Sequence, residues 1–575
     1  MNRNPVISVP AGVRVACLGL VGIVYLLIPF GGDGTAELVP NFALLRFHLM
    51  NELAIPYFTP AKCAGWVLAA HPKNLLFTTF TPLVLLIPNS YTAVKMAHAM
   101  HTFAFGTGLY AWFRWLGIKN SVARLFGAVL ISFSGYWILK TVPAGHVDVL
   151  YGSALAPWIL VVFENLFSEE PKTRNRYLGL FVVLTGLFVL LVNSVYWLLI
   201  VLPLLGARVA IEALYLRKSH VRRVFAGFSV ILISSVVAIV LSAPALAGVY
   251  EYSMQAFPRT AAHFQVMSDT RSLIEMLVRS FFDSGIVVGN RHDGVLGSPH
   301  EYSNFIGLMS LPLMAVGLFR LKTLFRSRAF GALVLAAVFQ LLLVRTTHVA
   351  DLARMVLPVL KSLTWYWRGS INLLLLYVAV VAAGAELLLA GRHRVFTLVC
   401  FSLMMLNLGE LGMVYSRAGL LSLETPEFFA NTMNSEEYFA KPVFPHSTNT
   451  GWQMWCWDTL TGYRSEFYHT LAHGGPVFQE DGTINMVDIR VLFGAAGKGG
   501  YFKDHTWPLW PASDREELLQ FLNFKQIMPK PLRLQVINIF SAMIWIVYLT
   551  LALFMGTRLA RRWLASTRRS VVQPV

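Results

Sequence analysis

The chain has 575 residues, of which 56% are hydrophobic and 13% are charged, and its formal net charge is +17. A soluble fold cannot bury that much apolar surface, so the composition predicts a mainly α, polytopic membrane protein. The positive charge could indicate nucleic-acid binding. However, the basic residues lie beside apolar runs, where they act as topology signals facing anionic lipid, so we expect no nucleic-acid partner. The four cysteines are too scattered for a disulfide framework or a zinc site.

About twelve segments are long and apolar enough to cross a bilayer at about 1.5 Å of rise per residue. They are 11–30, 91–115, 121–140, 149–167, 177–195, 196–216, 224–246, 301–320, 329–346, 370–390, 395–415 and 534–557. The first of them has no small-residue cleavage site at its end, so we expect an anchor rather than a cleaved signal peptide.

Lys and Arg gather in alternate short loops, which sets the predicted orientation. The basic loops lie near 114–124, 172–176, 217–223, 320–328 and 392–394. The connections 141–148 and 193–196 contain neither residue type. The positive-inside rule therefore puts both termini in the cytoplasm.

Residues 75–88 are apolar but too short to cross the bilayer, and Pro82 interrupts them. We therefore expect 31–90 to be one external loop that carries interfacial helices. Residues 416–533 are polar and long enough for a small domain, and the alternation in 484–492 predicts that it is mixed α/β.

Three units follow from this division of the chain. They are a transmembrane module, 1–415, with external loops 31–90, 141–148, 247–300 and 347–369; an external domain, 416–533; and a last helix with a basic tail, 534–575.

A carboxylate follows the first span in the run Gly31-Gly32-Asp33-Gly34. Glycines let backbone approach a ligand closely, so Asp33 is the best candidate for a catalytic base. Asp148 and His146 lie in the connection 141–148, at the same predicted membrane level. Two acids from distant loops at one level predict one site. The alternative is that each acid only caps or solvates a helix end.

A set of basic residues also falls on the predicted external side. It comprises Arg46, Lys62, Lys73, Lys95, Arg259, Arg291 and Arg368. Lys95, His98 and His101 recur every three residues, so they share one helix face, which could hold a phosphate through charge-assisted hydrogen bonds. Snorkelling to lipid head groups is the alternative for any single Lys. Arg368, in an aromatic loop just before a helix, is the stronger candidate.

No nucleotide-binding motif is present. Residues 494–500 (GAAGKGG) are not a P-loop, because the glycine spacing is wrong and no Ser or Thr follows Lys498. The sequence also lacks a dinucleotide-binding fingerprint and an HExxH motif. These absences argue against an ATP-driven pump.

Three groups of short stretches, taken in order, resemble the GT-C superfamily of polytopic glycosyltransferases, most closely its bacterial YfhO-like branch. The first group is 33–46, 54–60 and 69–88; the second is 108–110, 116–118, 134–136, 145–146 and 156–158; the third is 301–308, 357–358 and 367–368. No single stretch is diagnostic, and the resemblance lies in their order and in the topology.

The resemblance implies an inverting enzyme on the external face of a bacterial inner membrane. Its donor would be a polyprenyl-phosphate-linked sugar, and its acceptor a cell-envelope glycan, lipid or protein. Asp33 matches the position of the family's catalytic base and Asp148 its second-loop acid. That loop has one acid here where some relatives have a pair, which leaves a divalent cation, Mg²⁺ or Mn²⁺, open. The donor phosphate would meet Arg368, Lys95, Lys73, Arg46 and Arg291, and the other site candidates are Glu37, His146, His71 and Glu301.

Two other functions stay open from the sequence. A lipid-linked oligosaccharide flippase or transporter would place ionisable residues along a mid-membrane path and would show broken helices in paired halves, and we expect neither. A non-catalytic scaffold for envelope assembly would leave Asp33 merely solvated.

Overall fold

The computed structural model describes residues 9–28, 86–142, 154–168, 196–214, 304–345, 347–356, 371–391 and 393–417, with isolated positions elsewhere. In these ranges the chain forms helices joined by turns, and they contain no strand. The mainly α prediction is thus confirmed for this part of the chain. The helices are α1 (Ala11–Leu27), α4 (Ser90–Trp112), α5 (Ser121–Ser132), α6 (Gly135–Thr141), α8 (Ala156–Ser168), α10 (Tyr196–Leu214), α15 (Ser310–Leu318), α16 (Leu321–Leu324), α17 (Arg328–Arg345), α18 (Thr347–Val356), α19 (Ile371–Leu389) and α20 (Arg394–Arg417).

Helices occupy most of the predicted spans, although the count of membrane crossings stays a prediction. The spans 177–195, 224–246 and 534–557 are described only at isolated positions. The external domain 416–533 lies outside the described residues except where α20 runs on to Arg417.

Three predicted boundaries differ from the structure. The predicted helix 301–320 begins only at Ser310, because Gly307 has a φ of +87° and the chain turns there. The predicted helix 121–140 breaks into α5 and α6 at residues 133–134. The predicted loop 347–369 begins with a helix, α18.

Within the part of the chain that the structure describes, three helical stretches are long and apolar enough to cross a membrane by length and composition: Ser121–Thr141, Ile371–Leu389 and Arg394–Arg417. α20 exposes a series of large apolar side chains, among them Leu398 (66%) and Met405 (66%). Contiguous apolar surface of this kind is unfavourable in water and suits hydrocarbon. The chain is therefore a membrane protein in its helical part.

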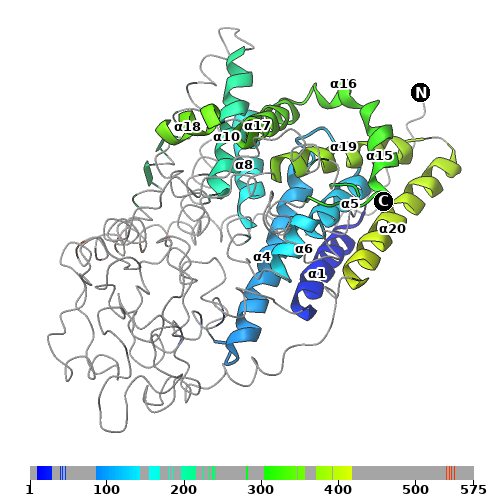
Figure 1. The fold of residues 1–575 in the computed structure, drawn as a ribbon, viewed down its shortest axis with the longest axis horizontal. Coiled ribbons are helices and arrows are strands. Elements are labelled where there is room, and N and C mark those ends of the chain that lie inside the picture. Colours follow the sequence, from blue (N-terminus) through cyan, green and yellow to red (C-terminus); the bar gives the residue numbers. More distant parts are fainter. Residues whose placement is uncertain are drawn as a thin grey trace, which may run out of the picture.

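The helices pack through small residues at their closest approaches. A Cβ on Gly384 of α19 would lie 1.8 Å from the carbonyl oxygen of Leu313, and one on Gly317 of α15 would lie 2.0 Å from that of Val380. Only glycine lets α15 and α19 approach this closely. Figure 1 shows α1, α4, α5 and α6 as one group of helices, with α8 packed between α4 and α10, and α17 packed against α10.

The structure brings residues of separate basic loops together at one end of the bundle. The backbone N–H of Lys119 donates to Glu386 at 3.1 Å, and Arg320 forms an ion pair with the same carboxylate at 3.6 Å. Ser327 donates a hydrogen bond to the carbonyl of Trp115. We call this the inner end. The positive-inside assignment requires the basic loops to lie on one side of the membrane, as these do. Which side faces the cytoplasm stays a prediction.

Candidate functional site

The opposite end of the bundle is where α1 and α6 end and α4 begins, and we call it the outer end. α4 starts at an Asn89 cap, whose side-chain oxygen accepts the Thr92 N–H at 2.8 Å. One turn further along, α4 presents Lys95 and His98, which are 3% and 0% exposed. This face of α4 is packed against the protein.

His98 of α4 contacts residues at the ends of two other helices, α1 and α6. Its imidazole meets the ring of Tyr25 of α1 edge to face, with centroids 5.2 Å apart. Its Nε2 lies 3.1 Å from the hydroxyl oxygen of Thr141, the last residue of α6. That hydroxyl donates its only proton to the carbonyl of Trp137 at 2.8 Å. We therefore assign a proton to Nε2 of His98, which donates to Thr141. We call Tyr25, His98 and Thr141 the outer junction.

Two further buried contacts hold α6 against α4 below the outer junction. The indole N–H of Trp137 donates to the hydroxyl of Thr102 at 3.2 Å, and its ring stacks on Phe105 with centroids 4.3 Å apart. His101 points its Nδ1 at the carbonyl of Ala97, 2.6 Å away, so this nitrogen carries a proton. The predicted face of Lys95, His98 and His101 thus exists, but its two imidazoles face protein groups.

Two buried lysines flank the outer junction. The Nζ of Lys95 lies 5.3 Å from the ring centroid of Tyr91, and the Nζ of Lys140 lies 4.1 Å from that of Tyr136. Each tyrosine is one helical turn before its lysine and shields part of the ammonium group. Lys140 is fully buried and was not among the predicted site residues. Its position at the end of an apolar span is the sequence signal that could have identified it.

The break between α5 and α6 is supported by two tyrosines from distant helices. The hydroxyl of Tyr25 donates to the carbonyl of Ser132, and that of Tyr415 in α20 donates to the carbonyl of Phe133 at 2.8 Å. Ser134 satisfies the carbonyl of Ile131 with its own hydroxyl at 2.7 Å. Carbonyls released by a helix break inside a membrane must find such donors, because lipid offers none.

The segment before α15 also pairs with this break. The N–H of Gly135 donates to the carbonyl of Phe305 at 2.7 Å. The Glu410 carboxylate of α20 accepts the N–H groups of Leu308 and Met309, each at 2.8 Å. A carboxylate at a helix start satisfies orphan donors and complements the helix dipole, so α20 fixes where α15 begins.

Most of the predicted site residues lie outside the described residues. These are Asp33, Asp148, Glu37, His146, His71, Glu301, Arg368, Lys73 and Arg291. Arg46 is described, and its guanidinium donates to the carbonyl of Pro88, just before α4. Of the predicted phosphate-binding set, the structure therefore places only Lys95, in the second turn of α4, and Arg46, whose guanidinium reaches the residues just before α4.

The described residues contain no group of three or more His, Cys, Asp or Glu side chains that could hold a metal ion. The predicted cation ligands, Asp33 and Asp148, fall outside that search.

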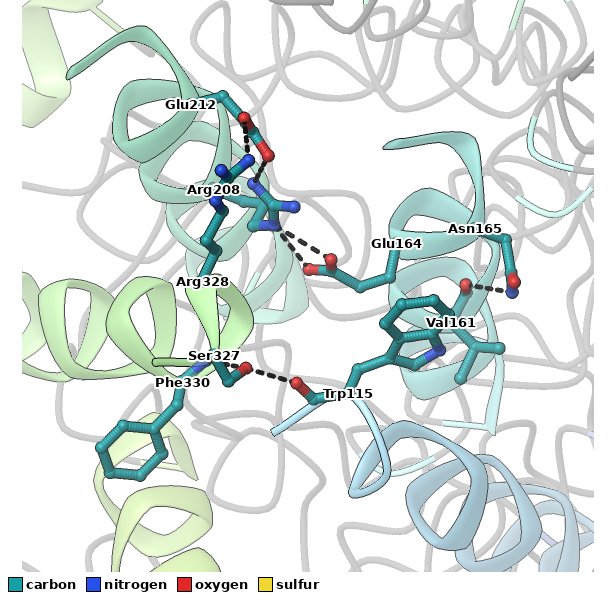
Figure 2. A network of polar contacts seen from close by, with 9 residues as sticks. All are labelled: Trp115, Val161, Glu164, Asn165, Arg208, Glu212, Ser327, Arg328 and Phe330. Atoms are coloured by element: carbon teal, nitrogen blue, oxygen red, sulfur yellow. Dashed lines mark hydrogen bonds and ion pairs between the residues drawn. The ribbon is translucent and has the colours of Figure 1, made fainter. Parts of the chain in front are cut away.

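A second polar site, near the inner end, was not predicted from the sequence. Figure 2 shows Arg208 of α10 between two carboxylates, Glu164 of α8 at 2.9 Å and Glu212 of α10 at 2.7 Å. Arg328, at the start of α17, pairs with Glu212 as well. We call these four residues the charge network. The Arg208–Glu212 spacing of four residues in an apolar helix is the signal that could have revealed it.

Comparison with known proteins gives little guidance. No protein-family model matches the chain, and no curated protein matches it by sequence. Among solved structures, the archaeal oligosaccharyltransferase AglB from Archaeoglobus fulgidus, in complex with an inhibitory peptide and a dolichol-phosphate, is similar with a TM-score of 0.43 and 11% identity. The match covers 78% of this chain and 61% of that one, so this chain spans less than two thirds of its length. Similarity at this level carries no argument about function, and the YfhO-like resemblance stays a prediction.

Proposed function

We propose that this protein is a membrane glycosyltransferase of the GT-C type. It moves a sugar from a polyprenyl-phosphate donor to a cell-envelope acceptor on the external face. Asp33 serves as general base, removing the proton of the acceptor hydroxyl as it attacks the anomeric carbon. Cations, of which Arg368 is the strongest candidate, stabilise the departing lipid phosphate.

The observation that supports this proposal best is the outer junction. Asp33 is six residues after Leu27, where α1 ends, and Asp148 is seven residues after Thr141, where α6 ends. An extended chain advances at most about 3.6 Å per residue, so each acid stays within about 25 Å of its helix end. Because Tyr25 and Thr141 both contact His98, the ends of α1 and α6, which precede the two acids in the sequence, lie close together.

The flippase alternative also gains an observation. The sequence interpretation expected no broken helices in paired halves, and the described residues show one break, between α5 and α6 at 133–134. It also expected the ionisable groups to cluster at the outer surface, and the structure adds Glu164 and Arg208, which are buried in apolar helices near the inner end. Interrupted helices and intramembrane charges are common in transporters, so transport stays the second candidate.

One experiment separates the two. The purified protein is reconstituted into vesicles of phosphatidylethanolamine and phosphatidylglycerol that contain labelled polyprenyl-phosphate hexose, pentose or N-acetylhexosamine. A glycosyltransferase releases or transfers the sugar, and Asp33→Asn abolishes this reaction. A flippase moves the intact donor between leaflets without breaking the sugar–phosphate bond. Intact donor movement with no sugar release by the wild type would reject the proposed function.

A further inference from the structure

We infer that Tyr25 and His98 are positioning residues, which fix the end of α1 relative to the end of α6. This inference rests on the proposed function for its catalytic consequence, since these two helix ends lead into the segments that carry Asp33 and Asp148. Neither residue needs to touch substrate. Their task is to hold two helix ends in one register.

Tyr25 is built to connect α1 with both halves of the broken helix. Its hydroxyl binds the carbonyl of Ser132, the last residue of α5. Its ring stacks on Phe133, with planes 15° apart and centroids 6.0 Å apart. Its ring edge meets His98, which leads on to α6. The tyrosine is fully buried, so movement of α1 would shift these groups together.

His98 completes the connection on the α6 side. Its Nε2–H donates to the hydroxyl of Thr141, and its ring contacts the ring of Tyr25. α6 has only seven residues, and its own hydrogen-bond ladder cannot hold its direction alone. Fixed partners at both its ends therefore set where it points: Phe305 at Gly135, and His98 at Thr141.

Tyr415 supplies a matched control for Tyr25. It is buried, and its hydroxyl binds the carbonyl next to the one that Tyr25 binds. It comes from α20, however, and its ring meets that of Phe305 edge to face, with centroids 6.4 Å apart. Tyr415→Phe thus loosens the same break from the α20 side and leaves the hydroxyl of Tyr25 on Ser132.

The geometric test does not depend on any enzyme activity. In full-length protein with its four cysteines (Cys17, Cys63, Cys400 and Cys456) replaced by alanine, spin labels are attached at Leu27→Cys and Ala144→Cys. Leu27 is 51% exposed at the end of α1 and accepts a label. Double electron–electron resonance then gives the distribution of distances between the two labels. We expect Tyr25→Phe and His98→Leu to broaden it and Tyr415→Phe to leave its width unchanged.

His98→Gln provides the rescue variant, because its amide N–H can reach Thr141 as Nε2 does, and we expect a distribution close to wild type. Equal broadening by Tyr25→Phe and Tyr415→Phe would show a merely structural break and overturn the inference. Unchanged widths in every variant would overturn it as well.

The catalytic consequence is a selective loss of turnover. Misplacing a reacting group by about 1 Å can cost about a hundredfold in rate, so Tyr25→Phe should lower kcat by about tenfold or more with little change in KM. Tyr415→Phe should keep its kcat per folded molecule. If the wild type turns over no donor, the proposed function fails, while the distance measurement still decides the inference.

Discussion

The outer junction and the charge network hold helices together by opposite means. At the outer junction, Tyr25, His98 and Thr141 meet through one hydrogen bond and one ring contact. In the charge network, Arg208 is 6% exposed and Glu212 is 1% exposed, and full charges face each other. The first region joins neutral groups, so losing one of them leaves no unpaired charge. The second region joins buried charges, and removing one of them leaves its partner charged and unpaired.

This difference indicates separate roles for the two ends. Breaking a buried ion pair by removing one partner is costly, because the remaining charge is stranded. A single neutral hydrogen bond contributes only about 1 kcal/mol, yet it fixes a direction. We therefore expect the inner end to determine stability and the outer end to determine geometry and turnover.

Arg208→Ala should have the largest effect on stability. It strands the carboxylate of Glu164 and leaves Glu212 with Arg328 alone, at a cost of about 3–5 kcal/mol. We expect a large fall in the melting temperature of the detergent-solubilised protein, measured by intrinsic fluorescence. Arg328→Ala is the control, since Arg328 has a partly exposed side chain and its removal leaves Arg208 paired with both acids. An Arg208→Ala melting temperature equal to that of the control would reject the stabilising role.

Much of the helical fold could be predicted from apolar runs, because membrane spans need length and hydropathy more than specific partners. The α5–α6 break could not, because Phe133-Ser134-Gly135 lies inside an apolar run, and the donors that stabilise it, Tyr25 and Tyr415, are remote in sequence. The same holds for Glu164, whose partner Arg208 lies on another helix. The sequence correctly predicts that Lys95, His98 and His101 share one face of α4. It could not predict that this face is buried, because the burial depends on packing against α1 and α6.

Gly384→Ala should have the next largest effect. Its Cβ would lie 1.8 Å from the carbonyl oxygen of Leu313, and backbone cannot give way as a side-chain tip can. Overpacking of this kind costs about 1–3 kcal/mol. Gly409→Ala in α20 is the matched control, because nothing lies within 4 Å of its Cβ position. Melting temperatures of the two variants measure the difference, and a loss no greater for Gly384→Ala than for the control would contradict the close α15–α19 approach.

Glu410→Ala should be milder. It removes the acceptor of the Leu308 and Met309 N–H groups at the start of α15, and losing a cap costs about 1–2 kcal/mol. Hydrogen exchange measured by mass spectrometry should rise for amides at 308–311. Glu410→Gln keeps one acceptor oxygen and should show a smaller rise. Unchanged exchange in Glu410→Ala would show that α15 needs no help from α20.

Thr141→Val should affect turnover more than stability. It removes the hydroxyl that joins His98 to α6 and leaves the buried Nε2–H of His98 without this acceptor, at a cost of about 1–3 kcal/mol, while nearly keeping side-chain volume. Trp137→Phe is the control, because it removes a neighbouring bond between the same two helices. Initial rates with a polyprenyl-phosphate sugar should fall for Thr141→Val beyond what its melting temperature explains. Equal rate losses per folded molecule for Thr141→Val and Trp137→Phe would contradict the proposed role of the outer junction in turnover.

The most direct test of the proposed function is single-turnover sugar release by Asp33→Asn, run beside wild type and Asp148→Asn, with binding of the labelled polyprenyl-phosphate sugar measured in parallel. We expect Asp33→Asn to bind donor normally but to lose transfer by about a hundredfold or more, the loss typical when a general base is removed. Transfer at the wild-type rate by Asp33→Asn would contradict the assignment of the base and, with it, the proposed catalytic site.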